Sequence, residues 1–105
     1  MHINAKTERG FVTVPAYRTA SPHLFVHRSL RADGSLGKDW AITHAATGLK
    51  LGRHVETRAV AKAWAAAVAD LDWGFESADE LPAEEFKYYG KRCHDARQEA
   101  IDTIE

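Results

Sequence analysis

The sequence predicts an α+β domain with a three- or four-stranded antiparallel sheet, one Ala-rich helix packed on it and a second, amphipathic helix at the C-terminus. Residues 11–55 contain short runs of alternating apolar and polar residues separated by Gly-containing turns, which is typical of antiparallel strands. The apolar period then changes to that of a helix, which predicts helices over residues 57–72 and 78–104. A chain of 105 residues, 45% of them hydrophobic, is long enough for a single domain with one core.

The N-terminal part of the chain is expected to supply the first two strands. Residues 1–10 are polar and lack periodicity, which predicts a flexible arm. Residues 11–17 are β-branched and aromatic, but Pro15 cannot donate to a ladder and therefore indicates an edge strand. Residues 19–22 have the composition of a turn, and residues 23–30 form the next predicted strand.

Alternation divides the strand over residues 23–30 between two faces. Leu24 and Val26 point to one face together with Arg28 and Leu30, and this face is expected to form the core. The opposite face is expected to be exposed and basic. The side chains predicted to line that exposed face are Phe25, His27, Arg31, Thr43, Lys50 and His54.

The next predicted unit is a β-hairpin over residues 40–52. Trp40 to His44 form its first strand, Ala46-Thr47-Gly48 the turn, and residues 49–52 the returning strand. This hairpin would complete the antiparallel sheet.

The helix over residues 57–72 begins with Thr57, a residue whose hydroxyl suits an N-cap, and continues with many alanines, the best helix formers. Its apolar stripe has helical spacing and is expected to lie on the sheet. The stripe consists of Val60, Trp64, Ala67, Val68 and Leu71.

The C-terminal helix is expected to start between Ser77 and Pro82, because Ser77 and Glu80 have the spacing of a capping box and proline suits a first helical turn. Gly90 is its predicted weak point. The seam can fold back on the domain or join two copies as a homodimer, and both alternatives stay open. The seam residues are Phe86, Tyr89, Cys93, Ala96, Ala100 and Ile104.

The net charge of −1 conceals an asymmetry along the chain. Residues 1–62 carry ten Lys and Arg against four Asp and Glu, whereas residues 63–105 carry four against eleven. Such an asymmetry is typical of proteins that bind a polyanion or present an acidic interaction surface. It equally fits two halves that attract each other within the fold.

No catalytic motif is found, and the sequence predicts neither an enzyme nor a cofactor. Cys93 and His94 are adjacent, so on a helix they point about 100° apart and do not suit the roles of nucleophile and base. His23 and His27 would lie roughly 13 Å apart on a strand, too far for one metal ion, and no metal site is predicted. Residues 34–37 lack the spacing of a nucleophile elbow or a phosphate loop.

The sequence also predicts a cytoplasmic protein without a membrane partner. It contains no apolar run near the roughly 20 residues that span a bilayer, and its first residues lack the apolar core of a signal peptide. The single cysteine, Cys93, cannot form an internal disulfide, which agrees with a reducing compartment.

The segment from Leu24 to Asp72 resembles two families of DNA-binding domains. Its order of motifs is Arg28 to Arg31, Gly37-Lys38-Asp39-Trp40-Ala41-Ile42, Thr47-Gly48-Leu49-Lys50-Leu51-Gly52, Thr57, and Ala61 to Ala65 with Trp64. This order is similar to that of the plant ethylene-response-factor type of DNA-binding domain and of the arm-binding domain of tyrosine-type phage integrases. The resemblance implies three strands packed on one helix, with Arg, Lys and Trp side chains of the sheet entering the major groove.

We therefore predict a small module that binds duplex DNA through a basic sheet face. Lys and Arg side chains projecting from strands can neutralise phosphates and release counterions. The predicted phosphate contacts are Arg28, Arg31, Lys38, Lys50 and Arg53.

The alternative function is that of a small protein-binding inhibitor or adaptor of phage or other mobile-element origin. Its acidic C-terminal helix would dock on a basic partner or mimic nucleic acid. The predicted partner-binding residues are Glu80, Glu84, Glu85, Asp95 and Glu99. A third hypothesis is a plain dimeric scaffold.

Overall fold

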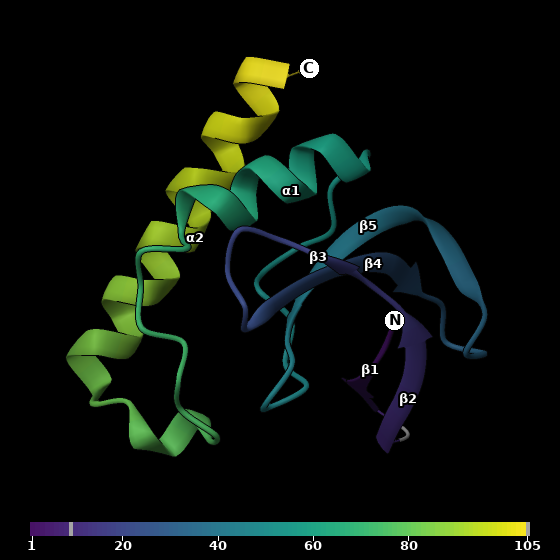
Figure 1. The fold of residues 1–105 in the computed structure, drawn as a ribbon, viewed down its shortest axis with the longest axis horizontal. Coiled ribbons are helices and arrows are strands. Elements are labelled where there is room, and N and C mark those ends of the chain that lie inside the picture. The colour runs from purple at the N-terminus through teal and green to yellow at the C-terminus, as the bar shows by residue number, and fades with distance from the viewer. Residues whose placement is uncertain (9, 105) are drawn as a thin grey trace.

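Two antiparallel sheets and two α-helices make up the structure, so the predicted α+β class is confirmed (Figure 1). The computed structural model describes residues 1–8 and 10–104. The strands are β1 (His2–Thr7), β2 (Gly10–Pro15), β3 (Tyr17–Arg18), β4 (Leu24–Leu30) and β5 (Leu36–His44). The helices are α1 (Arg58–Ala67), the short 3-10 helix η1 (Ala78–Glu80) and α2 (Ala83–Ile104).

The larger sheet has the strand order β3-β4-β5, and all neighbours are antiparallel. The hairpin predicted at residues 40–52 is confirmed only in part. After β5 the chain turns back, but it meets β5 at two isolated bridges, through Lys50 and Val55, instead of forming a continuous strand. Gly52 lies between these bridges with a φ of 64°, in the left-handed region, and this conformation interrupts the extended backbone.

Helix α1 covers one face of the larger sheet (Figure 1). Thr57 caps it as predicted, because its Oγ1 accepts a hydrogen bond from the Val60 N–H at 3.2 Å. Trp64 is fully buried at the centre of the core under this helix. The other fully buried large side chains of this core are Leu24, Val26, Ile42, Val60 and Val68.

Helix α1 ends at Ala67, earlier than the predicted residue 72. Val68 has left the helical conformation, and its carbonyl accepts a hydrogen bond from the Trp73 indole N–H at 2.9 Å. A tertiary contact therefore overrides the helix propensity of the alanine-rich sequence.

The opposite face of the larger sheet is covered by a second sheet, in which β1 pairs with β2. The prediction of a flexible arm for residues 1–10 was wrong, because β1 occupies most of this segment. Ile3 and Ala5 point inward and pack with Val14 and Phe25, while Asn4 between them is exposed. In the sequence, only these two inward residues show the alternation of a strand. Two residues are too few to distinguish a strand from a polar arm.

The strand predicted over residues 11–17 is divided between the two sheets. Residues up to Pro15 belong to β2, and Tyr17 begins β3 in the larger sheet. The N–H of Ala16, between them, donates to the Met1 carbonyl at 2.8 Å. Since Pro15 has no N–H to donate, the small sheet ends there and the chain passes to the larger one.

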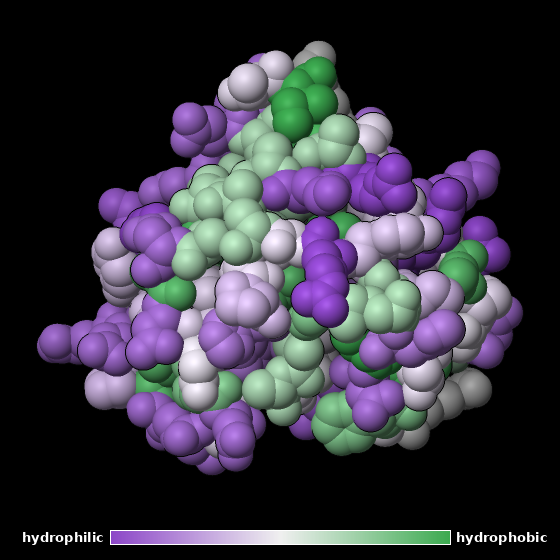
Figure 2. Space-filling model, in the orientation of Figure 1, coloured by the Kyte–Doolittle hydropathy of each residue, from purple (hydrophilic) through white to green (hydrophobic). Residues whose placement is uncertain are grey.

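Helix α2 packs against α1 through small side chains (Figure 1). Cys93, Ala96 and Ala100 are buried at spacings of three and four, so α2 folds back on its own domain. Figure 2 shows a mildly hydrophobic, pale green surface where the two helices cross. Burial raises the pKa of the Cys93 thiol to about 11, which keeps it neutral at pH 7. Phe86 and Ile104, at the ends of the seam, remain exposed.

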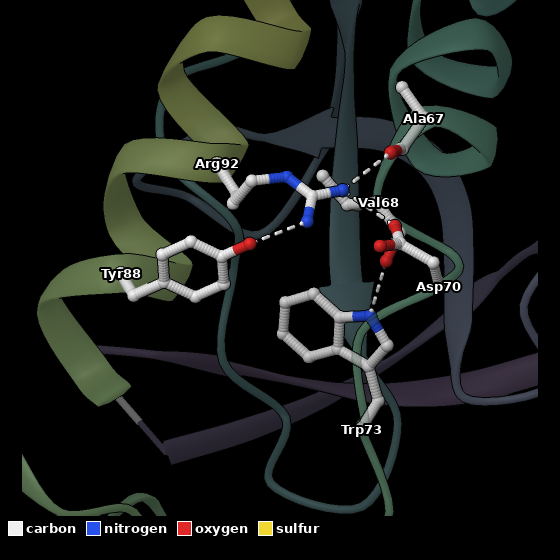
Figure 3. A network of polar contacts seen from close by, with 6 residues as sticks. All are labelled: Ala67, Val68, Asp70, Trp73, Tyr88 and Arg92. Atoms are coloured by element: carbon white, nitrogen blue, oxygen red, sulfur yellow. Dashed lines mark hydrogen bonds and ion pairs between the residues drawn. The ribbon is translucent and has the colours of Figure 1, made fainter.

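A polar network joins α2 to the chain that follows α1 (Figure 3). The Nη2 of Arg92 donates to the Asp70 carboxylate at 2.6 Å and to the Ala67 carbonyl at 3.2 Å. Its Nη1 donates to the Tyr88 hydroxyl at 3.0 Å. The hydrogen bond from Arg92 lowers the pKa of the Asp70 carboxyl. Because Ala67 is the last residue of α1, one cation satisfies the end of that helix and anchors α2 to it.

Replacing Gly90 with Ala is expected to stabilise the protein by about 0.5–1 kcal/mol. Gly90 lies inside α2, and a Cβ built there meets no atom within 4 Å, so alanine gains helix propensity without a clash. Thermal unfolding measures the effect, and a melting temperature below that of the parent would contradict it. Gly37→Ala is the control: its Cβ would clash with the Ser29 hydroxyl, so this variant should be less stable.

Candidate nucleic-acid interface

The sheet face that was predicted to bind DNA is largely closed. Three of its side chains, Phe25, His27 and Thr43, are buried on the side of the sheet that β1 and β2 cover. The Nδ1–H of His27 donates to the Arg28 carbonyl, and its Nε2 accepts from the Thr43 hydroxyl, both at 2.7 Å. Burial lowers the pKa of His27 below its ordinary value of 6.5, so the ring is neutral. His27 is therefore a buried, neutral side chain instead of the exposed cation that the prediction required.

Cations and aromatic rings instead gather where α1 begins. This cation–aromatic cluster consists of Tyr17, Arg28, Trp40 and Arg58. The Arg28 Cζ lies 5.0 Å from the centroid of the Trp40 ring. The Arg58 Cζ lies 5.0 Å from the Tyr17 ring and 5.8 Å from the Trp40 ring. The two rings are 5.9 Å apart, and their planes are tilted by 56°.

The fold brings the cluster together from four elements. Arg28 of β4 and Trp40 of β5 are direct partners in the antiparallel register. Tyr17 of β3 pairs with Val26, two residues from Arg28, and so shares its face of the sheet. Arg58 is the first residue of α1 and lies over the same face.

The guanidinium groups of this cluster have no carboxylate partner among residues 1–8 and 10–104. Among the described residues the one ion pair joins Arg92 and Asp70, both in the acidic part of the chain. The described carboxylates of the acidic half therefore do not neutralise Arg28 or Arg58 through direct ion pairs. A guanidinium stacked on a ring keeps its in-plane N–H groups available for a further acceptor.

A basic cleft of about 840 Å³ lies between the small sheet and the larger one. Its cationic lining residues are Lys6, Arg31 and Lys50, with His54 beside them. Lys50 Nζ lies 3.4 Å from His54 Nε2. Burial and the Lys50 charge lower the pKa of His54. Two carboxylates, those of Glu8 and Asp33, also line this cleft, so its charge is mixed.

A second cleft, of about 700 Å³, lies between α2 and the chain that returns along β5. We name it the aromatic cleft after its lining rings, which are Trp64, Trp73, Phe75, Phe86 and Tyr89. Lys50 and Arg53 lie on its wall, so Lys50 borders both clefts.

The five cations predicted to contact phosphate do not share one surface. Arg28 belongs to the cation–aromatic cluster. Lys38 is exposed on β5, the strand that also carries Trp40. Arg31 and Lys50 line the basic cleft, and Arg53 lines the aromatic cleft. The single basic face expected from alternation is therefore divided, because the small sheet covers its middle.

Three members of the cation–aromatic cluster were not among the predicted phosphate contacts, and of these Trp40 entered only through the family resemblance. Tyr17 was assigned to an edge strand and Arg58 to the helix, each without a role. One local feature could have pointed to Arg58. It directly follows the N-cap Thr57, and the first residue of α1 lies where this helix meets the sheet. Neither spacing nor alternation links it to Tyr17, which is 41 residues earlier in the chain.

The acidic residues predicted to bind a protein partner lie in η1 and α2. Glu80 serves the fold, since its carboxylate accepts from the backbone N–H groups of Glu76 and Ser77 at 2.6 and 2.7 Å. The remaining predicted residues, Glu84, Glu85, Asp95 and Glu99, are exposed. Within the described residues, neither α-helix combines the length and apolarity needed to cross a bilayer.

Comparison with known protein families, curated proteins and solved structures finds no match for this chain. The resemblance to ethylene-response-factor and integrase arm-binding domains therefore stays a prediction. Any function has to be inferred from the residues of this chain alone.

Proposed function

We propose that the protein binds nucleic acid, with duplex DNA as the expected ligand, through the cation–aromatic cluster. The observation that carries this proposal is the pair of guanidinium groups, Arg28 and Arg58, which stack on rings and have no carboxylate partner among the described residues. Stacking restricts each guanidinium before binding, so less conformational entropy is lost when it meets a phosphate. A planar guanidinium can also donate two parallel hydrogen bonds to one phosphate group.

The surroundings of the cluster fit a phosphate backbone. Lys38 is exposed on β5 and adds a cation on the strand that carries Trp40. Tyr17 is 45% exposed, so part of its ring remains available to a sugar or a base. Affinity would come mainly from phosphate neutralisation and would fall steeply as salt is added.

The proposal is tested with the double variant Arg28→Gln and Arg58→Gln, assayed by titration of a fluorescent DNA duplex at several salt concentrations. We expect an affinity at least tenfold lower at low salt, and a salt slope smaller by about two, one for each lost phosphate contact. The matched control is Lys87→Gln with Lys91→Gln, which removes the same charge from exposed positions on α2.

The two double variants separate a local site from general charge attraction. Equal loss of affinity in both would overturn the proposal, since the net charge alone would then explain binding. A parent protein whose affinity for duplex DNA does not depend on salt would overturn it too. Tighter binding to a single strand, with the same sensitivity to Arg28 and Arg58, would support the cluster and correct the form of the ligand.

The adaptor function remains a second proposal, favoured by one observation. Asp95 and Glu99 are exposed one turn apart on α2, and neither forms an ion pair with a described residue. Deleting α2 cannot test this function, because Cys93, Ala96 and Ala100 belong to the core. Asp95→Lys with Glu99→Lys is the suitable test: partner capture should disappear, while the affinity for DNA should not decrease.

A further inference from the structure

The aromatic cleft lies apart from the cation–aromatic cluster, and two buried N–H groups of its lining residues have no hydrogen-bond partner among the described residues. Its volume of about 700 Å³ is within the range of small-molecule sites in proteins. It lies between α2, the returning chain at residues 47–53, and the segment that contains η1. None of the four cluster residues lines it. It could therefore be occupied independently of nucleic acid.

The walls of the cleft suit an apolar, preferably aromatic, body. The rings of Trp73 and Tyr89 stand edge to face, with centroids 5.2 Å apart and planes at 71°. Phe75 packs beside both, at 6.1 Å from Trp73 and 6.3 Å from Tyr89. Phe86 and Leu49, at the rim, are 57% and 40% exposed. These side chains would gain apolar burial from a bound ring.

Two buried donors belong to residues of this same wall. The Trp64 Nε1–H and the Arg97 Nε–H have no hydrogen-bond partner among the described residues, although each atom is inaccessible to solvent. The guanidinium of Arg97 is held in place, because its Nη2 donates to the His54 carbonyl at 2.9 Å. Buried N–H groups normally have an acceptor, so a small shift of the wall that opens either donor to the cleft would be stabilised by a ligand that brings an acceptor.

The charge of the wall specifies the acceptor. Three cations, Lys50, Arg53 and Arg97, line the cleft, and no Asp or Glu side chain of the described residues does. This composition is notable because the cleft borders α2, in the acidic half of the chain. An anionic head group would meet positive charge and find hydrogen-bond donors there.

From this combination we infer that the aromatic cleft binds a small amphipathic carboxylate, a ligand with one aromatic or aliphatic body and one carboxylate head. The body would lie against the rings of Trp73, Phe75 and Tyr89. The head would point toward Arg97, with the cations of the rim around it. Neither a purely apolar ligand nor a cation would use all of these features.

The inference is tested with 2-naphthylacetate and its neutral counterpart 2-(2-naphthyl)ethanol, titrated into the ¹⁵N-labelled full chain. The protein has three tryptophans, so their indole N–H signals are few and separable. We expect the Trp64 signal to move on addition of the carboxylate, and the Trp40 signal, which reports on the cation–aromatic cluster, to stay in place. The alcohol should bind about tenfold more weakly or not at all.

Two variants make the test specific. Gly90→Leu adds a side chain at the wall of the cleft, where a Cβ meets no atom within 4 Å, so it should fold normally and bind the carboxylate at least tenfold more weakly. Arg97→Lys keeps the charge but lacks the Nε–H. It should lower the affinity for the carboxylate more than the affinity for the alcohol. Lys87→Gln is the control, since this exposed cation of α2 does not line the cleft.

The outcomes decide the inference without reference to the proposed function. Equal affinity for the carboxylate and the alcohol would overturn it, because the charged wall would then have no role. Binding that moves all three indole signals alike, or that survives Gly90→Leu unchanged, would overturn it as well. Loss of DNA binding in the variant with Arg28→Gln and Arg58→Gln leaves this result untouched, since neither residue lines the cleft.

Discussion

Trp64→Ala is expected to lower the free energy of unfolding by about 3–5 kcal/mol, at the upper end of what a single core substitution costs. The side chain is fully buried between α1 and the larger sheet, and it is the largest of the fully buried residues. Its removal loses both the transfer free energy of the indole and the packing of the surrounding residues, which can collapse only in part. Because a total stability of about 5–15 kcal/mol is common, the variant would be marginally folded.

Urea unfolding of the parent and of Trp64→Ala measures this effect, with the slope against urea concentration as a check on the two-state assumption. Trp64→Phe should destabilise much less, because the six-membered ring remains and the unpartnered indole N–H is removed. Lys62→Ala, on the exposed side of the same helix, should change stability by less than about 0.5 kcal/mol. A Trp64→Ala effect as small as that of Lys62→Ala would contradict the described core.

Lowering the pH from 7 to 5 is expected to destabilise the protein. His27 and His44 are 1% and 2% exposed, and burial lowers the pKa of both below the ordinary 6.5. The Nε2–H of His44 donates to the Trp73 carbonyl at 2.6 Å, and its Nδ1 accepts from the Thr47 hydroxyl at 2.9 Å, so the ring is neutral in the fold.

The sign of the effect follows from proton binding. Below about pH 6.5 the unfolded chain binds protons at these rings and the folded chain does not, so the free energy of unfolding decreases as the pH falls. The loss continues until the folded-state pKa of each ring is reached. Each ring contributes a slope of at most about 1.4 kcal/mol per pH unit. His54, whose pKa is also lowered by burial, acts in the same direction.

Urea unfolding at pH 7.5, 6.5, 5.5 and 5.0 measures this dependence. His27→Gln and His44→Gln each remove one titrating ring and should give a shallower slope between pH 6.5 and 5, whatever their stability at neutral pH. Thr103→Ala is the control, because Thr103 is exposed on α2 and has no titratable group, so its replacement should leave the slope unchanged. Identical slopes for the parent and the His27→Gln and His44→Gln variants would contradict the described environments of these rings.

The sequence predicted those parts of the fold that depend on local pattern. The α+β class and the N-cap Thr57 follow from period and capping chemistry, and the structure contains them. The helix predicted over residues 78–104 is instead interrupted: η1 ends at Glu80, and α2 begins at Ala83, directly after Pro82. Ser77 and Glu80 form the predicted capping box on η1. Local pattern could not predict the second sheet. The inward residues of β1 include one as small as Ala5, so this strand resembles a polar arm as long as its pairing with β2 is not known.

The candidate site was predicted less well than the fold, for a related reason. Alternation correctly separated Arg28 from His27, but it could not show which face of the sheet another element covers. The sheet face that contains His27 was predicted to be open to solvent, but the small sheet covers it. The opposite face was predicted to form the core, yet Arg28 lies at its margin and is exposed. Sites assembled from distant segments, such as Tyr17 with Arg58, depend on topology that spacing along the chain does not encode.

The margins of the larger sheet bear on how copies of this protein behave at high concentration. On one side the outermost strand, β3, has only two residues, and on the other the irregular chain after β5 touches it at isolated points. Neither margin, within the described residues, offers a long row of free amide and carbonyl groups onto which a strand from a neighbouring molecule could add. The interruptions that make this sheet irregular therefore also leave its margins without a template for edge-to-edge polymerisation.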